Sequence, residues 1–295
     1  MRRFRRHAVT LVSEEIRGWG DAAPRFIPYV DRVPPIDHPL NLTTQAILTD
    51  LSWALTAVLL VIAIRMGVRE RTPFYALLVL AALVGAFAEP LYDVAMMLYF
   101  YSTPGMWTHF TAFDIPQPIW THSGYVVLYA APAIYIARQI AHRMMTQRTL
   151  FVWAGITLLE SAAFEIIGIN GGLYGYWGPH VFRIFQYPLV IGVLEAAQVI
   201  VFAVAASQLR ARCTAQWQLL GLFVLFPCTF FMSNFGAGWP TIIAVHLKHT
   251  STPVIAAATV TSICVAAVLV RAAASFLPRS TADAADRESL SATTA

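Results

Sequence analysis

The chain has 295 residues, of which 58% are hydrophobic and only 12% carry a charge, and its mean hydropathy is +0.61. Because an ordinary soluble domain contains about 25% charged residues, this composition excludes a soluble globular protein and predicts a polytopic membrane protein. The formal net charge of +4 comes from arginines beside the apolar segments, which indicates a membrane as the partner and not nucleic acid.

Apolar segments follow one another along most of the chain. Residues 1–43 are polar and contain prolines, so we predict an N-terminal leader without the apolar core of a cleavable signal peptide. A membrane-spanning helix needs about 20 mostly apolar residues. We therefore predict an all-α transmembrane domain over residues 44–277, with seven helices at 44–64, 74–100, 119–141, 150–169, 184–208, 216–235 and 253–277. Residues 278–295 are rich in Ser, Thr, Ala and Asp, which predicts a disordered C-terminal tail.

Arginines mark every second connection between the predicted helices. They follow the first, third, fifth and seventh helices, at Arg65, Arg69, Arg71, Arg138, Arg143, Arg148, Arg210, Arg212, Arg271 and Arg279. Because arginine-rich loops stay on the cytoplasmic side, we predict a multi-pass protein of the cell membrane with a cytoplasmic C-terminus and an outer N-terminus. The arginines at the start of the chain oppose this orientation, but they lie far from the first helix, where the rule is weak. A re-entrant segment near residues 239–247 would place the N-terminus inside instead.

Three acidic residues, Glu89, Asp93 and Glu165, lie in the halves of the apolar segments that this orientation places toward the outside, and a fourth, Glu195, lies near the middle of the fifth helix. Ionisable groups at membrane depth are costly unless they pair or line a wet cavity, so they indicate a functional site. Glu89 and Asp93 share one helix face, whereas Glu160 lies five residues before Glu165 and points elsewhere. We predict one polar cavity that opens toward the outer side. The alternative is that these acids only hydrogen-bond neighbouring helices.

Polar and aromatic side chains accompany the acids. Glu195 and Gln198 share a helix face, and Ser233 and Asn234 end the sixth helix on the same side of the membrane. His122 is a further catalytic candidate, the alternative being an interfacial histidine bonded to a backbone carbonyl. The candidates for substrate binding lie near the outer membrane surface: Tyr125, Tyr174, Tyr176, Trp177, His180 and Arg183. The alternative for the aromatic residues is a belt at the membrane interface. Arg183 could instead extend to a lipid headgroup or pair with an acid.

These residue types suit acid–base chemistry on an apolar substrate. A carboxyl group in a wall of low dielectric stays protonated near neutral pH, while a second one that accepts hydrogen bonds can stay ionised. Aromatic faces stabilise cations, so the site would protonate an alkene or epoxide, shelter the carbocation, and then remove a proton or activate water. The substrate would enter from the bilayer and would be an isoprenoid or another hydrophobic lipid. No cofactor and no metal site is predicted, although Glu, Asp and His side chains suit divalent metals, and the three cysteines show neither metal-ligand nor disulfide spacing.

One stretch resembles a known family. It contains a glutamate near a helix end, a Gly- and Tyr-rich turn and a helix begun by proline: Glu165, Gly168, Gly171, Gly172, Leu173, Tyr174, Gly175 and Tyr176, followed by Tyr187, Pro188, Leu189 and Val190. This order is similar to that of the integral-membrane carotenoid hydratases, and the size and number of spans resemble the small membrane-bound terpene cyclases of meroterpenoid pathways. The resemblance implies a helical membrane enzyme that uses buried carboxyl groups to hydrate or cyclise an isoprenoid.

Two other classes of protein are compatible with buried acids. A proton-coupled membrane transporter of a small or lipophilic solute would use them as relays, but such carriers often show internal repeats, which this sequence lacks. A non-catalytic membrane subunit would use them to bind a partner helix. The sequence also contains no dinucleotide-binding fingerprint, nucleophile elbow or HExxH motif, which argues against hydride-transfer, acyl-transfer and zinc-protease chemistry.

Overall fold

The computed structural model describes residues 33–278, so the predicted tail and most of the predicted leader lie outside the described residues. Within them, six helical runs are long and apolar enough to cross a membrane: Leu42–Glu70, Phe74–Met96, Gln147–Asn170, Leu189–Arg212, Gln216–Ala237 and Thr252–Ala274. This confirms the prediction of a mostly helical chain with several helices that are long and apolar enough to span a membrane.

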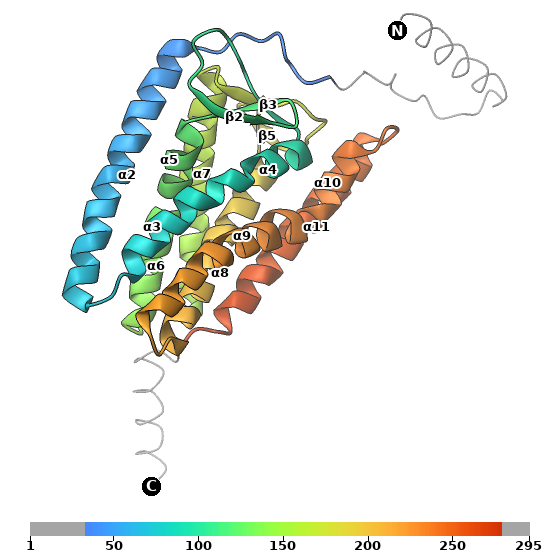
Figure 1. Ribbon diagram of the computed structural model, residues 1–295. Coiled ribbons are helices and arrows are strands. Elements are labelled where there is room, and N and C mark those ends of the chain that lie inside the picture. Colours follow the sequence, from blue (N-terminus) through green and yellow to red (C-terminus); the bar gives the residue numbers. More distant parts are fainter. Residues whose placement is uncertain (1–32, 279–295) are drawn as a thin grey trace, which may run out of the picture. The chain divides into compact units, whose positions relative to one another are not determined.

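Several of these runs consist of more than one helical element. The elements are α2 (Leu42–Glu70), α3 (Phe74–Gly85), η2 (Ala86–Ala88), α4 (Glu89–Met96), α7 (Gln147–Asn170), α8 (Leu189–Arg212), η4 (Gln216–Gly221), α9 (Leu222–Phe231), η5 (Met232–Ala237) and α11 (Thr252–Ala274). At the position of the third predicted helix, α5 (Trp120–Tyr125), η3 (Val126–Ala130) and α6 (Ala131–Ala141) follow one another. Consecutive runs alternate in direction, and α2, α5–α6, α8 and α11 run opposite to α3–α4, α7 and α9 (Figure 1).

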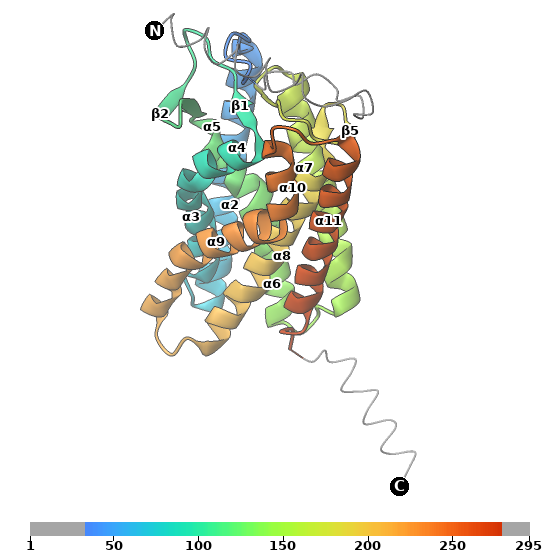
Figure 2. The ribbon, with the colours of Figure 1, turned by 90° about the vertical axis from the view of Figure 1, so that its right-hand side faces the viewer.

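The first helix ends at Glu70 and not at residue 64, and three further differences from the prediction follow. The second run ends at Met96 and not at residue 100, because the next residues pair as a strand. The helix α8 begins at Leu189 and not at residue 184, because a short hairpin precedes it. The sixth run is followed by α10 (Trp239–His246), which continues in the direction of α9 (Figure 2). The segment near residues 239–247 therefore extends that run in the same direction.

Small antiparallel ladders interrupt the helical pattern at the end of the helices where α4 and α7 finish. They pair β1 (Leu98–Phe100) with β4 (Tyr174–Tyr176), β2 (Thr108–Ala112) with β3 (Ile115–Pro118), and β5 (Arg183–Ile184) with β6 (Tyr187–Pro188). The expectation of an all-α domain was wrong for these connections. Their backbone groups pack against the helix ends and need hydrogen-bond partners, which the ladders supply.

The central helix is α8. It packs against α6, α7, α9 and α11, and 83% of its apolar stretch is buried, compared with 22% in α7. Because other helices surround it, a carboxyl group on α8 faces protein and not lipid.

The second run bends at η2, directly before Glu89. Pro90 has no N–H to donate to the carbonyl of Ala86, and the carbonyl of Leu83 lies 2.6 Å from His122 Nδ1, which donates to it. These two features replace the regular helical hydrogen bonds of one turn. The bend therefore arises from the sequence and from a neighbouring helix together, and it precedes the turn that holds the first two acids.

Candidate active site

The four acids that the sequence singled out are all buried and gather near one end of the helices. Glu89 is 8% exposed, Asp93 0%, Glu165 7% and Glu195 4%. The first two lie on α4, and the others lie on α7 and α8. Glu165 is within electrostatic range of both Glu195 and Glu89, so they form one group.

Glu89 and Asp93 form the first part of this group. The hydroxyl of Tyr125 donates to Glu89 Oε2 at 2.5 Å, and the amide of Gln117 donates to Asp93 Oδ2 at 2.6 Å. The other carboxyl oxygen of Asp93, Oδ1, is buried and has no hydrogen-bond partner within the described residues.

Glu195 forms the second part. It accepts hydrogen bonds from the hydroxyl of Tyr129 at 3.0 Å and from the hydroxyl of Ser161. The Ser161 hydroxyl in turn lies 3.0 Å from that of Tyr187. Gly192 permits this arrangement, because a Cβ at that position would lie 2.8 Å from the Tyr187 hydroxyl.

Glu165 forms the third part. The hydroxyl of Tyr176 donates to Glu165 Oε2 at 3.1 Å and lies 3.4 Å from the hydroxyl of Tyr92. Burial, and after it the charge of Glu165, raises the pKa of Tyr176 well above its ordinary value. The phenol of Tyr176 therefore keeps its proton and remains a donor to the carboxyl group.

The carboxyl groups have hydroxyl and amide partners and no cationic ones. Among residues 33–278 the one salt bridge joins Arg210 to Glu70 at 2.9 Å, at the opposite end of the helices (Figure 1). Ionising all four carboxyl groups would bury like charges without a counter-ion, which costs several kcal/mol per ion. The group therefore holds protons as well as acceptors, which acid–base chemistry needs.

The two tyrosines that bind Glu89 and Glu195 form one cluster of five aromatic rings with three others. We call Tyr92, Tyr125, Tyr129, Phe226 and Phe230 the aromatic box. The centroid of Phe230 lies 5.8 Å from Tyr92, 5.6 Å from Tyr125 and 6.3 Å from Tyr129, and that of Phe226 lies 6.0 Å from both Tyr125 and Tyr129. The box can stabilise a positive charge, because aromatic faces attract cations.

Of the predicted substrate-binding residues, three tyrosines lie close to the acids. Tyr125 and Tyr176 bind them directly, as described above, and the ring of Tyr174 packs over Gly168, where a Cβ would lie 2.5 Å from its hydroxyl. These three were selected on sequence alone, and the structure brings them to Glu89 and Glu165.

The other predicted site residues lie apart from the acids. His122 binds the Leu83 carbonyl and lies 3.1 Å from a nitrogen of His109. Trp177 is half-buried and packs against hydrophobic residues of the core.

The last two predicted residues bind backbone carbonyls. His180 donates to the Met96 carbonyl at 2.8 Å. Arg183 donates to the carbonyls of Gly178, His180 and Gln186, and within the described residues no hydrogen bond joins it to an acid. Both residues therefore hold the connection before α8 in place.

Five residues of the hydrogen-bonded group were not among the predicted site residues: Tyr92, Gln117, Tyr129, Ser161 and Tyr187. Helical spacing was an available signal for two of them, because Tyr129 follows Tyr125 by four residues and Ser161 precedes Glu165 by four. Gln117 lies in a connection, where no periodicity points to it. Helical spacing predicted that Glu160 points away from Glu165. In the structure Glu160 is half-buried and is not part of the group.

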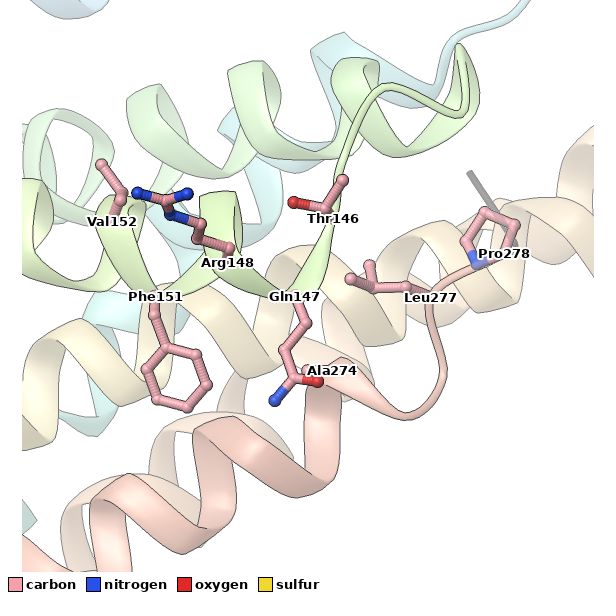
Figure 3. Close-up of a pocket in the computed structure, with 8 residues that line it drawn as sticks. All are labelled: Thr146, Gln147, Arg148, Phe151, Val152, Ala274, Leu277 and Pro278. Atoms are coloured by element: carbon pink, nitrogen blue, oxygen red, sulfur yellow. The ribbon is translucent and has the colours of Figure 1, made fainter. Parts of the chain in front are cut away.

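The predicted outward opening is not found. The four carboxyl groups are at most 8% exposed, and Tyr174 and Tyr176 of the β1–β4 ladder lie over Glu165. A pocket of about 910 Å³ lies instead at the opposite end, where Gln147 at the start of α7 faces Ala274 at the end of α11 (Figure 3). The expected cavity mouth is closed because strand pairing, which hydropathy does not report, covers it.

Within residues 33–278, no three His, Cys, Asp or Glu side chains are grouped so that they could hold a metal ion. Comparison of the chain with protein-family models, curated proteins and solved structures finds no match.

Proposed function

We propose that this protein is an integral-membrane enzyme that cyclises or hydrates an isoprenoid or a related lipid by acid–base catalysis. The observation that carries the proposal is the group of four buried carboxyl groups, bound by neutral hydroxyl and amide donors, next to the aromatic box. Buried carboxyl groups without counter-ions are costly in a membrane protein and are typical of functional sites. The likeness of residues 165–190 to carotenoid hydratases, and of the architecture to membrane-bound terpene cyclases, is compatible with this chemistry.

In this proposal Glu89 and Glu195 act as a pair, one as the acid and the other as the base. Each is bound to a tyrosine of the aromatic box, Glu89 to Tyr125 and Glu195 to Tyr129. The protonated carboxyl group transfers its proton to a carbon of an alkene or to the oxygen of an epoxide, and the resulting carbocation lies against the aromatic faces. In cyclisation a carbon–carbon bond then forms, and the carboxylate removes a proton from the neighbouring carbon. In hydration the carboxylate takes a proton from the attacking water.

The proposal includes an orientation with seven spans, the third being the run α5–η3–α6. The arginine-rich connections Arg65–Arg71, Arg138–Arg148 and Arg210–Arg212 follow the helices that run in one direction, which favours a cytoplasmic location for that end. The four carboxyl groups then lie in the outer part of the membrane domain. A hydrophobic substrate reaches the site from the bilayer, after helices or the β1–β4 ladder move apart.

The test is a pair of conservative substitutions in the two proposed catalytic residues. Glu195→Gln and Glu89→Gln keep the size of the side chain and one oxygen that accepts a hydrogen bond, but an amide can act neither as the acid nor as the base. We expect at least ~100-fold less product from either variant, because general acid–base catalysis contributes about 10²–10⁴ in rate. The product is identified by mass spectrometry of lipids from cells with and without the protein, where an unchanged mass indicates cyclisation and an added water indicates hydration.

Glu160→Gln is the matched control, because Glu160 is an acid on α7 outside the hydrogen-bonded group. It should leave the product unchanged, and all three variants should be recovered from the membrane in similar amounts. Normal product from both Glu195→Gln and Glu89→Gln would contradict the proposed function. Accumulation of a solute in proteoliposomes that collapses with the proton gradient would favour the transporter.

A further inference from the structure

Three fully buried polar side chains lack partners for most of their polar atoms. Both amide atoms of Gln198, the hydroxyl of Ser233 and the amide oxygen of Asn234 have no hydrogen bond within the described chain, and all three residues are 0% exposed. The Asn234 amide nitrogen donates to the carbonyl of Phe230 at 3.1 Å. A buried polar group without a partner is costly, so unpartnered groups that lie together indicate a bound molecule.

The helices α8 and η5 bring these side chains to the same depth. A Cβ on Gly238 would lie 2.9 Å from a methyl group of Leu194, so these two residues are opposite each other. The helices run in opposite directions (Figure 2). Gln198 lies one turn further along α8 than Leu194, and Asn234 lies one turn before Gly238. The two amides are therefore neighbours across the helix–helix contact.

The three unpartnered side chains lie next to the proposed catalytic groups along the helices. Gln198 lies on α8 between Glu195 and Phe202, and the ring of Phe202 is 4.9 Å from that of Phe226 in the aromatic box. Asn234 lies one turn beyond Phe230, which also belongs to the box. The unpartnered groups thus border both Glu195 and the box.

The chemistry of the side chains specifies what they bind. Ser233 and Asn234 lie in η5, a segment of π-helix, and π-helical turns occur frequently at functional sites. An amide offers a donor and an acceptor without net charge. Gln198 Nε2 can donate to an oxygen that in turn donates to Asn234 Oδ1, and a hydroxyl group meets both requirements. An anion would lack a counter-charge here, because neither side chain is charged.

We propose that Gln198, Ser233 and Asn234 form a subsite for a hydroxyl group, which belongs either to a water molecule or to the lipid-like ligand. The subsite adjoins the acid–base site, and in assigning it to that reaction the inference rests on the proposed function. A water held there is available for hydration, and a substrate hydroxyl held there fixes the position of the chain in the aromatic box.

The test is a structure of the full-length protein in lipid nanodiscs, at a resolution that shows ordered water, with and without farnesol as the probe. We expect density for an oxygen atom within hydrogen-bonding distance of the Gln198 and Asn234 amides. If farnesol replaces this density by its own hydroxyl, the subsite binds the ligand; if the density persists unchanged, the subsite binds water. Direct hydrogen bonds between the two amides, with no density between them, would overturn the proposal.

Variants connect the density to the side chains. Gln198→Met keeps the length of the side chain and should lose the density, and Ser233→Ala is a second, smaller change in case the first does not fold. Gln139→Leu is the control, because Gln139 lies in the last turn of α6, toward the end of the helices opposite the acids, and this variant should retain the density. Density that survives in both Gln198→Met and Ser233→Ala would contradict the assignment.

This result is independent of turnover. Density at the subsite in a protein whose Glu195→Gln and Glu89→Gln variants both form normal product would refute the proposed function and leave the subsite in place. An empty subsite in a protein that depends on Glu195 would refute the subsite alone.

Discussion

Neutral hydroxyl groups are the main partners of the buried carboxyl groups in this protein. Tyr125, Tyr129 and Tyr176 each donate to one of them. An arginine in the same place would hold a carboxylate permanently ionised, because its own proton is not exchanged in proteins. A phenol stabilises either protonation state of its partner, so these residues keep the carboxyl groups available both as acids and as bases.

His180 lies outside the spanning helices. Its protonation should make the stability of the protein depend on pH. Its Nε2 donates to the Met96 carbonyl, and its buried Nδ1 has no hydrogen-bond partner within the described chain. Burial lowers the pKa of His180 from 6.5 to about 4, an effect that the bond to Met96 opposes and that Arg183 and His246 increase. The folded protein therefore favours the neutral imidazole.

The sign of the effect follows from this preference. Below about pH 6.5 the unfolded chain binds a proton at His180 that the folded chain does not, so stability is full above this pH and is lost as the pH falls toward 4. The loss from this residue reaches about 3 kcal/mol. His180→Gln should remove this contribution, so that thermal unfolding in detergent shows a smaller decrease between pH 7 and pH 4.5 than in the wild type.

The control for this prediction is His142→Gln, which changes an exposed histidine at the other end of the helices. It should keep the wild-type dependence on pH. An equal dependence in His180→Gln and in the wild type would show that His180 does not carry the effect.

At the scale of single elements, irregular helical turns hold or precede the residues of the site. The turn η2 precedes Glu89, the π-helix η3 contains Tyr129, and the π-helix η5 contains Ser233 and Asn234. A regular α-helix presents successive turns at a fixed rotation of about 100° per residue, and a π-helical turn shifts that rotation. The irregular turns thus place side chains that straight helices would direct elsewhere.

The contact between α3 and α9 depends on a glycine. A Cβ on Gly85 would lie 2.1 Å from the ring of Phe226, and Phe226 is fully buried, so it cannot move aside. We expect Gly85→Ala to destabilise the protein by about 1–3 kcal/mol, the usual cost of overpacking, and to displace a ring of the aromatic box. Unfolding in mixed detergent measures this loss.

Gly155→Ala is the matched control on α7. No atom lies within 4 Å of a Cβ at Gly155, so alanine should stabilise the helix by about 0.5–1 kcal/mol through its better helix propensity. Similar effects of the two substitutions would contradict the close approach of α3 and α9.

At the scale of the whole molecule, the helices place the carboxyl groups and the arginine-rich connections at opposite ends. The orientation that we infer puts the turn between β2 and β3 outside and the connection between α6 and α7 in the cytoplasm. Phe113 lies in the first and is 59% exposed, and Met144 lies in the second and is 63% exposed. Both positions are therefore suitable for chemical labelling.

Single cysteines test this orientation in a protein whose native Cys213, Cys228 and Cys264 are changed to serine. A membrane-impermeant thiol reagent should label Phe113→Cys in intact cells and Met144→Cys only after the membrane is opened. The reverse pattern would place the arginine-rich end outside. Labelling of both positions in intact cells would show that the two connections lie on one side, which contradicts the odd number of spans between them.

The sequence by itself determined that the chain is a helical membrane protein and where its long apolar segments lie. It also identified the four acids, because each is a charged residue within an apolar segment. Both the hydropathy of a segment and the cost of burying a charge in it depend only on residues that are near one another in the chain. Glu89 and Asp93 were paired from their spacing alone, and Glu160 was separated from Glu165 by the same reasoning.

Only the tertiary structure decided which side chains meet. Ser161 and Gln117 reach the acids from other elements, and Tyr187 contacts the hydroxyl of Ser161. His122 binds a carbonyl of the neighbouring helix, and the β1–β4 ladder closes the predicted opening. These contacts depend on the rotation of each helix and on pairing between residues far apart in the chain, such as Leu98 and Tyr176. Neither is encoded in a local pattern, because an error of one residue turns a helical side chain by about 100°.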